Sequence, residues 1–323
     1  KKHQEGGPLD LECRIGAELL EQAAKRANKK HATKLLEWAA QLADPTADIK
    51  ARINLACSRH VAGIARIYPQ RDWETTSTRS IMLIERELAA FSTWYEYFPR
   101  SCVYDGKTHG TFKDAAKQLP LIHKMGFNIV YFPPIHPVGR EFRKGKNNTL
   151  SPCSEDVGSP WAIGAKEGGH KSILPALGSL EDFQHFLEEA EIRGMEVALD
   201  IAFQCAPDHP WVKKHPEWFR WRPDGTVQYA ENPPKKYQDI LPINFESDDW
   251  KNLWDELKSV FEYWIEQGVK VFRVDNPHTK SMEFWRWCIL NIKAKHPEVI
   301  FLAEAFTRPK RKYFLAKSGF THG

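Results

Sequence analysis

The sequence lacks long apolar runs, paired cysteines and a strong excess of charge. No run approaches the roughly 18 apolar residues that cross a membrane, and 46 basic against 42 acidic residues leave a net charge of +4. The polar start is no signal peptide. These features exclude a membrane-spanning chain and argue against a nucleic-acid partner. The six cysteines form no Cys-x-x-Cys pair, so we expect reduced thiols in a cytoplasmic protein without metal or cofactor.

The chain begins at Lys1 without an initiator methionine, and we expect it to be an internal segment of a longer protein. Its 323 residues suffice for one large domain and a smaller one. The pattern of apolar residues predicts a boundary near residue 80. Residues 1–79 are expected to form a helical domain and a joint, and residues 80–323 a larger α/β domain.

Residues 10–68 read as a small helical bundle. Apolar side chains recur at helical spacing around Leu20 and Leu35, Pro45 interrupts the pattern, and a further helix is predicted to carry Ile53 through Ile67. This part has no plausible catalytic cluster. Packing or interaction is its expected role.

From residue 80 onward, short apolar runs alternate with amphipathic stretches. The predicted strands are 93–98, 129–132, 196–202, 269–274 and 299–303, and the predicted helices are 111–125, 179–193, 248–267 and 281–295. This alternation predicts parallel β/α units. A doubly wound sheet would fit too, but the Gly-rich dinucleotide turn is absent, and polar and aromatic residues crowd just past the strand ends, as in a barrel.

The fold class predicted is therefore α/β, an incomplete (β/α)8 TIM-type barrel of about five strands after a small helical bundle. Two connections, residues 133–178 and 204–247, are much longer than usual. Loops of that length in a compact domain are commonly functional.

Two acidic residues end consecutive predicted strands. Arg273 and Asp275 share a side of their strand, so the guanidinium can hold the carboxylate ionised, as a nucleophile requires. Glu304 follows an apolar run, and desolvation there would raise its pKa, as a general acid at neutral pH requires. A structural salt bridge is the alternative for the first pair. Asp200, near the end of another strand, is expected to support the site rather than react.

These segments resemble glycoside hydrolase family 13, the α-amylase superfamily, over about residues 80–323. In that pattern an Asp-bearing strand, an Arg-x-Asp strand and a Glu-ending strand follow in this order. The resemblance implies that Asp275 is the nucleophile, Glu304 the acid/base and Arg273 their partner. The family's Asn and His after the first of these strands are replaced here by Gln204 and Cys205.

Several short sequence segments are similar to those of one branch of that superfamily, the bacterial α-1,4-glucan:maltose-1-phosphate maltosyltransferases. They are WYEYFPRS at 94–101, PIHPVG at 134–139, GSPWAIG at 158–164, NPPKKYQDI at 232–240, VDNPHTK at 274–280 and AEAFTRP at 303–309. The helical N-terminal part also looks like that family's helical insertion. The branch implies a phosphate-binding group of donors and further substrate contacts. The donors are Lys144, Gln204, Asn232, Lys235, Tyr237 and Asn276, and the further contacts are Asp200 and His278.

The resemblance implies transfer of maltosyl from α-maltose 1-phosphate to α-1,4-glucan with retention, in a homodimeric parent. The family also requires a third carboxylate and three further strands, which no segment after Glu304 supplies. We therefore expect activity to belong to the longer parent. Two alternatives stay open: another retaining enzyme of the superfamily, such as an amylase, debranching or branching enzyme, or a non-catalytic glucan-binding fragment.

Overall fold

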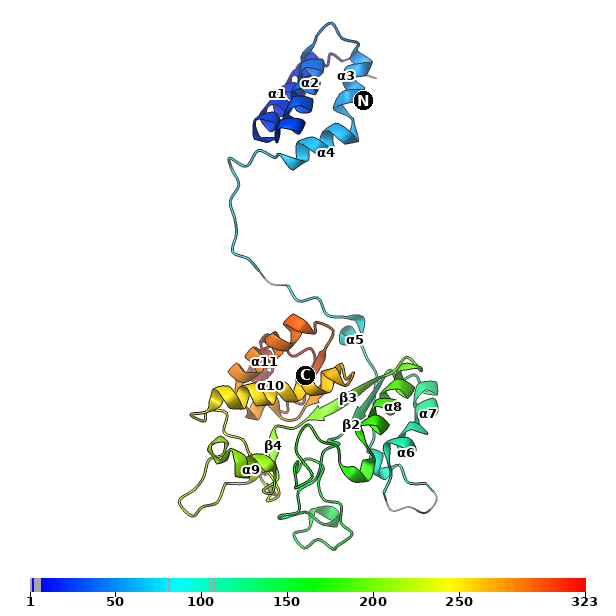
Figure 1. Ribbon diagram of the computed structural model, residues 1–323, viewed down its shortest axis with the longest axis vertical. Coiled ribbons are helices and arrows are strands. Elements are labelled where there is room, and N and C mark those ends of the chain that lie inside the picture. The colour runs from blue at the N-terminus through cyan, green and yellow to red at the C-terminus, as the bar shows by residue number, and fades with distance from the viewer. Residues whose placement is uncertain (1, 3–6, 81, 105, 107–108) are drawn as a thin grey trace. The chain divides into compact units, whose positions relative to one another are not determined.

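The computed structural model describes residues 2, 7–80, 82–104, 106 and 109–323 and divides into two compact units, Lys1–Met82 and Leu83–Gly323. Figure 1 shows the helices of the first unit and the mixed helices and strands of the second. In the part of the chain that the structure describes, no helix is both long and apolar enough to cross a membrane.

The first unit consists of helices around a small apolar core. They are α1 (Asp10–Arg26), α2 (Lys29–Ala43), α3 (Ile49–Ala56) and α4 (Arg59–Ile67). Leu20 of α1 and Leu35 and Leu42 of α2 are buried in this core. The single helix predicted from Ile53 to Ile67 is wrong, because Ser58 interrupts it. The Ser58 side chain accepts a hydrogen bond from the Val61 amide and so starts α4 as a separate helix.

The second unit is built on a five-stranded parallel sheet with the order β1-β2-β3-β8-β9. Its strands are β1 (Trp94–Glu96), β2 (Ile129–Phe132), β3 (Glu196–Ile201), β8 (Val271–Val274) and β9 (Ile300–Ala303). The spatial order follows the chain order throughout, whereas a doubly wound sheet reverses direction at a switch point. The predicted incomplete barrel is thereby confirmed.

Helices cover the outer face of the sheet. They include α6 (Phe112–Ala116), α7 (Leu119–Lys124), α8 (Leu180–Glu191), α10 (Trp250–Glu266), α11 (Met282–Lys295) and α12 (Pro309–Lys317). Phe132, Phe272 and Phe301 pack under them in the main core. The inner face carries a separate apolar layer that includes Ile129 and Val271. The short α5 (Glu87–Ala90) precedes β1 and packs against the inner face through Ala89. The helix predicted over 111–125 is two helices, because Pro120 has no amide hydrogen to continue the ladder.

Both long connections contain small elements of their own. Residues 204–247 hold β4 (Gln204–Cys205), α9 (Pro210–Lys214), η4 (Pro216–Trp218), β5 (Ala230–Asn232), β6 (Lys235–Tyr237) and β7 (Leu241–Pro242). Residues 133–178 hold the 3-10 turns η2 (Lys146–Asn148) and η3 (Pro175–Leu177). The strands of 204–247 pair as β4-β7 and as the hairpin β5-β6, both antiparallel.

A row of buried histidines joins the two connections. The His170 and His209 rings are linked by a 3.2 Å hydrogen bond, and His170 Nε2 donates to the Ala202 carbonyl at 3.0 Å. His209 Nδ1 accepts from the Trp211 amide, so its Nε2 carries the hydrogen that His170 Nδ1 accepts. Gly164 lies so close to His209 that an added Cβ would stand 2.0 Å from the ring. The loops are thus clamped against each other and against the end of β3.

Candidate active site

Asp275 and Glu304 each follow the last residue of a strand, on the adjacent strands β8 and β9. Their backbones continue the parallel ladder by one step: the Asp275 amide donates to the Ile201 carbonyl at 2.9 Å, and the Glu304 amide donates to the Val274 carbonyl at 3.0 Å. Because the ladder is still intact at these positions, both side chains are held by the sheet rather than by mobile loops.

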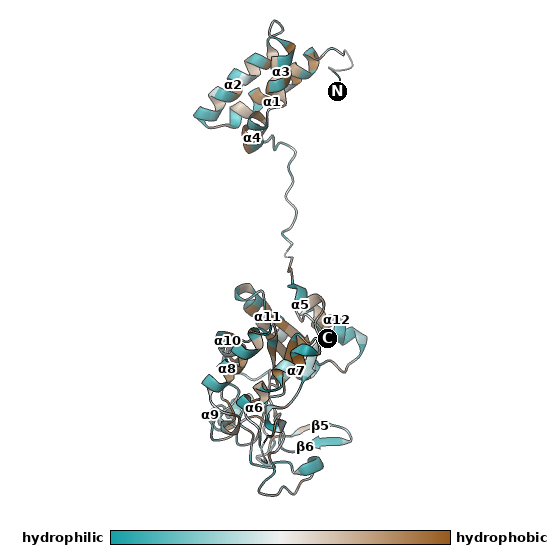
Figure 2. Cartoon of the chain, turned by 90° about the vertical axis from the view of Figure 1, so that its right-hand side faces the viewer, coloured by the Kyte–Doolittle hydropathy of each residue, from teal (hydrophilic) through white to brown (hydrophobic). Residues whose placement is uncertain are grey.

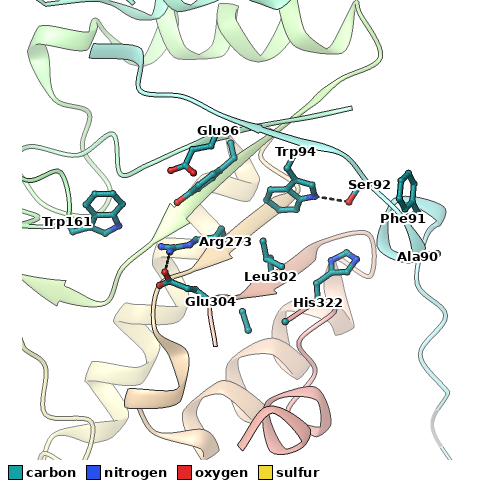
Figure 3. Close-up of a pocket in the computed structure, with 13 residues that line it drawn as sticks. Ala90, Phe91, Ser92, Trp94, Glu96, Trp161, Arg273, Leu302, Glu304 and His322 are labelled. Carbon is teal, nitrogen blue, oxygen red and sulfur yellow. Dashed lines mark hydrogen bonds and ion pairs between the residues drawn. The ribbon is translucent and has the colours of Figure 1, made fainter. Parts of the chain in front are cut away.

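Arg273 connects the carboxylates of three neighbouring strands. Its Nη1 lies 2.7 Å from Asp200 Oδ2 and 3.0 Å from Asp275 Oδ1, and its Nη2 lies 2.6 Å from Glu304 Oε1. Figure 3 shows the guanidinium pointing at Glu304. Burial lowers the pKa of Arg273, but the surrounding acidic groups, Asp200 foremost, raise it above its ordinary value. The guanidinium therefore stays charged, and its planar set of donors fixes the positions of the three carboxylates relative to one another.

Asp200 is buried beneath this ion-pair group and receives several donors on one oxygen. Tyr131 donates its hydroxyl to Asp200 Oδ2 at 2.6 Å, and Trp161 donates its indole N–H to the same atom at 3.1 Å. Burial raises the pKa of Asp200 to about 7, opposed by the Arg273 charge. Because Asp200 contacts Arg273 and not Glu304, its position suits support of the guanidinium.

The Glu304 carboxyl has the electrostatics of a general acid. Burial raises its pKa to about 7, and hydrogen bonding with the Asp275 carboxyl and the Asp275 charge act in the same direction, whereas Arg273 opposes them. The Asn276 amide donates to Glu304 Oε2 at 3.3 Å. Asn276 reaches this position in a left-handed conformation, with φ of 42°, which asparagine adopts more readily than most residues.

Together, the two acids can carry out a nucleophilic displacement at an acetal carbon, one acting as nucleophile and the other as proton donor. Asp275 is oriented by Arg273 Nη1 and by the Asn276 side-chain amide, which donates to Asp275 Oδ1 at 3.3 Å. A fixed carboxylate beside a carboxyl with raised pKa is the arrangement of glycosidases that pass through a covalent intermediate.

A cavity of about 830 Å³ opens on the inner face of the sheet next to these acids. Trp94, Glu96 and Trp161 line it together with Arg273 and Glu304, as Figure 3 shows. Two tryptophan rings and a further carboxylate therefore lie on the same face of the sheet as Arg273 and Glu304.

All but one of the donors expected around a phosphate lie on the two long connections. Lys144 is buried, and its Nζ donates to the Gln238 side chain and, at 3.4 Å, to the Lys236 carbonyl. Gln204 donates to the Trp161 carbonyl at 3.4 Å. Lys144 thus joins residues 133–178 to β6, and Gln204 joins β4 to residues 133–178.

The remaining predicted donors lie on the hairpin β5-β6 and after β8. Asn232 and Lys235 are paired across the hairpin and exposed, and Figure 2 shows β6 as hydrophilic. Tyr237 is half-buried and packs in a small cluster that also contains Trp161. His278 is half-buried in the turn η5 (Pro277–Thr279), where burial lowers its pKa.

Sequence reasoning missed two residues at the acidic site and one on the second long connection. Tyr131 and Trp161 both donate to Asp200. Asp239 is buried, which raises its pKa, and the Lys144 charge opposes this rise. The GSPWAIG and NPPKKYQDI segments contained Trp161 and Asp239. Their individual roles depend on how the long connections fold, which no local pattern encodes.

Comparison with known proteins gives close relatives over the whole chain. A family profile described as α-1,4-glucan:maltose-1-phosphate maltosyltransferase, domain N/S, matches residues 1–86. Proteins named α-1,4-glucan:maltose-1-phosphate maltosyltransferase include one from Methylacidiphilum infernorum, 54% identical over 97% of this chain and 47% of its own length. Another, from Chlorobaculum tepidum, is 53% identical over 100% of this chain and 48% of its own. The chain spans about half the length of these curated relatives.

Solved structures with a similar fold include α-amylases. One from Lactobacillus plantarum is 27% identical with a TM-score of 0.57, covering 72% of this chain and 49% of that one. A maltogenic α-amylase from Thermotoga neapolitana is also 27% identical, with a TM-score of 0.56, and covers 70% and 47%. The chain is therefore a relative, along its whole length, of the α-1,4-glucan:maltose-1-phosphate maltosyltransferases, and its larger unit has the α-amylase fold.

Proposed function

We propose that the longer protein containing this chain transfers maltosyl from α-maltose 1-phosphate to the non-reducing end of an α-1,4-glucan, with retention and release of phosphate. The observation that carries the proposal is the single guanidinium of Arg273 bound to Asp200, Asp275 and Glu304 at the ends of adjacent strands. The names of the relatives supply the substrates.

In the first half-reaction, an Asp275 oxygen attacks the anomeric carbon while the bond from that carbon to the phosphate oxygen breaks. Glu304 donates its proton to the leaving oxygen, and phosphate departs. In the second, Glu304 takes a proton from the acceptor hydroxyl, whose oxygen attacks the anomeric carbon and displaces the Asp275 carboxylate. Two inversions give net retention.

The leaving phosphate is assigned to donors of the two long connections and to Asn276, which follows β8. Lys144, Gln204, Asn232, Lys235, Tyr237 and Asn276 are proposed to bind it, with Asp200 and His278 contributing to the sugar-binding surface. Support comes from Lys144, which reaches the β6 backbone, from Gln204, which donates to the Trp161 carbonyl, and from Tyr237, which packs against the same small apolar cluster as Trp161. Charge-assisted hydrogen bonds of this kind suit a dianionic group. A homodimeric, cytoplasmic parent completes the proposal.

The direct test is release of inorganic phosphate from α-maltose 1-phosphate in the presence of glycogen. It is run on this chain and on the full-length protein, with glycogen omitted as the control. Glycogen-dependent release by the full-length protein, accompanied by longer glucan chains, is expected. Reducing sugar released from glycogen alone, without use of the phosphate donor, would indicate an amylase.

A further inference from the structure

Three side chains that commonly bind metals meet where the connection 204–247 leads into α10, among elements distinct from those of the acidic site. His215 follows α9, Glu217 lies in η4, and Asp249 immediately precedes α10. One ligand atom from each can be chosen so that all lie within 4.8 Å of one another. His215 Nδ1 is 3.1 Å from Glu217 Oε1, and both side chains are partly open to solvent.

The backbones that carry these residues are fixed to each other. Ser247 donates its hydroxyl to the Glu217 carbonyl at 2.8 Å. The Ser247 Oγ in turn accepts a hydrogen bond from the Asp249 amide at 3.2 Å. Ser247 is buried. The separation of η4 from the start of α10 is therefore set before any ion binds.

Neighbouring side chains also fix the orientation of His215 and Asp249. The His215 ring stacks on Trp218 with centroids 3.9 Å apart and 7° between the planes. Trp218 donates its indole N–H to Asp249 Oδ2 at 2.9 Å, and Asn252 donates its side-chain amide to Asp249 Oδ1 at 2.6 Å. Each carboxylate oxygen keeps a second lone pair. Donors of this kind, placed behind a ligand, orient it and strengthen metal binding.

We propose that His215, Glu217 and Asp249 bind a divalent transition-metal ion, of the Zn²⁺, Co²⁺ or Mn²⁺ type, with water completing its coordination. One imidazole nitrogen with carboxylates favours these ions over Ca²⁺ and Mg²⁺, which prefer oxygen alone. The bound ion ties the connection 204–247 to α10. The sequence contains no motif for such a site, because Asp249 is remote from the His-Pro-Glu segment. The proposal does not depend on the transferase function.

The chain contains its own comparison. His-Pro-Glu occurs twice, at 215–217 and at 296–298, and His296 Nδ1 lies 3.5 Å from Glu298 Oε1 in the second copy. Among the residues that the structure describes, no further ligating side chain completes a group of three there. The difference between the two copies is Asp249 and its supporting donors.

The test is titration of the metal-free chain with Co²⁺ at pH 7.5, followed by the visible d–d absorption and by calorimetry. One saturable site is expected, abolished in His215→Ala and in Asp249→Asn and unchanged in His296→Ala. Asn252→Ala, which keeps every ligand, should weaken binding about tenfold or more. Circular dichroism checks that each variant is folded, and Asp249→Asn preserves shape if His215→Ala fails to fold.

Equal Co²⁺ affinity in the parent chain, His215→Ala and Asp249→Asn would overturn the proposal. So would the absence of saturable binding, or an intense near-ultraviolet charge-transfer band, which would place the ion on a cysteine thiolate.

Discussion

Arg273 is a side chain on which several roles converge. One guanidinium binds the acids expected to act as nucleophile and as proton donor, and also Asp200. A guanidinium can do this because its donors form a rigid planar fork, which a lysine ammonium cannot reproduce.

Glu304 gives the first prediction. In the full-length protein, Glu304→Gln should slow transfer to glucan by about 10²–10⁴-fold, the usual contribution of general acid–base catalysis. Its raised pKa, about 7, also predicts that steps needing the protonated form slow as the pH rises through 7, and that this dependence is lost in Glu304→Gln. Rates of glucan extension between pH 5.5 and 8.5 measure both effects.

Azide provides the control for that experiment, because it attacks the anomeric carbon without needing a base. It should restore turnover of α-maltose 1-phosphate by Glu304→Gln, giving maltosyl azide. Failure of azide to restore any turnover would contradict the role of Glu304 as base in the second half-reaction, and would mean that the variant is blocked at the first half-reaction or is misfolded.

Trp161 gives a second prediction at this scale. Trp161→Phe keeps a ring in the cavity wall but removes the N–H that binds Asp200 Oδ2 at 3.1 Å. Loss of one hydrogen bond to a charged group corresponds to roughly 1.5–3 kcal/mol, so we expect kcat to fall about tenfold or more with a smaller change in KM. A change confined to KM would place Trp161 in sugar binding alone.

Lys235 separates a phosphate-using transferase from an amylase. Lys235→Ala in the full-length protein should lower kcat/KM for α-maltose 1-phosphate by about one to two powers of ten. A neutral activated maltoside should be affected much less, since its route still uses Asp275 and Glu304. Equal losses on both substrates would assign Lys235 to folding or to general sugar binding.

At the scale of elements, the buried rings of His136, His170 and His209 form a histidine clamp between the connections 133–178 and 204–247. Burial lowers the pKa of His136 to about 4 and that of His209 to about 3, and it lowers the pKa of His170 as well. These rings are neutral in the folded protein, whereas the unfolded chain takes up protons below pH 6.5. Stability should therefore be lost as the pH falls from about 6.5 toward 4.

His136→Asn tests this sign. Its Nδ1 bonds the Ser172 carbonyl at 3.0 Å, and an asparagine amide can replace that donor without titrating. From pH 6.5 to pH 5 the parent should lose roughly 2 kcal/mol more of unfolding free energy than the variant, as the shift of one group allows. Urea unfolding at the two pH values measures it. His185→Asn, a change at an exposed residue, should leave the parent's loss unaltered.

Elements were predictable where one local rule dominates. The strand Ile129–Phe132 matches its prediction, since a short run of apolar residues is typical of a strand buried on both faces. The helix expected over 111–125 failed at Pro120, whose missing amide hydrogen was visible in the sequence. The clamp could not be predicted, because His136, His170 and His209 meet only after both connections fold.

At the scale of the molecule, the two units have hydrophobic cores with no residue in common. Leu35→Ala should destabilise residues 10–67 by about 2–5 kcal/mol, and Phe272→Ala the barrel unit by about 3–5 kcal/mol. Hydrogen exchange followed by mass spectrometry should show faster exchange in peptides of the altered unit. Equal acceleration of both units in either variant would show that they unfold as one.

For the site, sequence reasoning predicted the acids at the strand ends. A carboxylate that follows an apolar run is costly to bury unless it is paired or belongs to a site. Asp275 and Glu304 follow β8 and β9 directly. It could not place Lys144 against β6 or Trp161 over Asp200, since those contacts join segments many residues apart through loops without a repeating pattern.

The order of the sheet bears on how the protein is made. Each strand pairs with the strand that precedes it in the sheet, from β1 to β9. As the chain leaves the ribosome from its N-terminus, every new strand therefore meets an edge that has already been synthesised. Asp200, Arg273 and Glu304 emerge in that order, so the guanidinium is present before the last acid it must bind. Asp275 and Glu304 are therefore brought together only when β9 docks on β8.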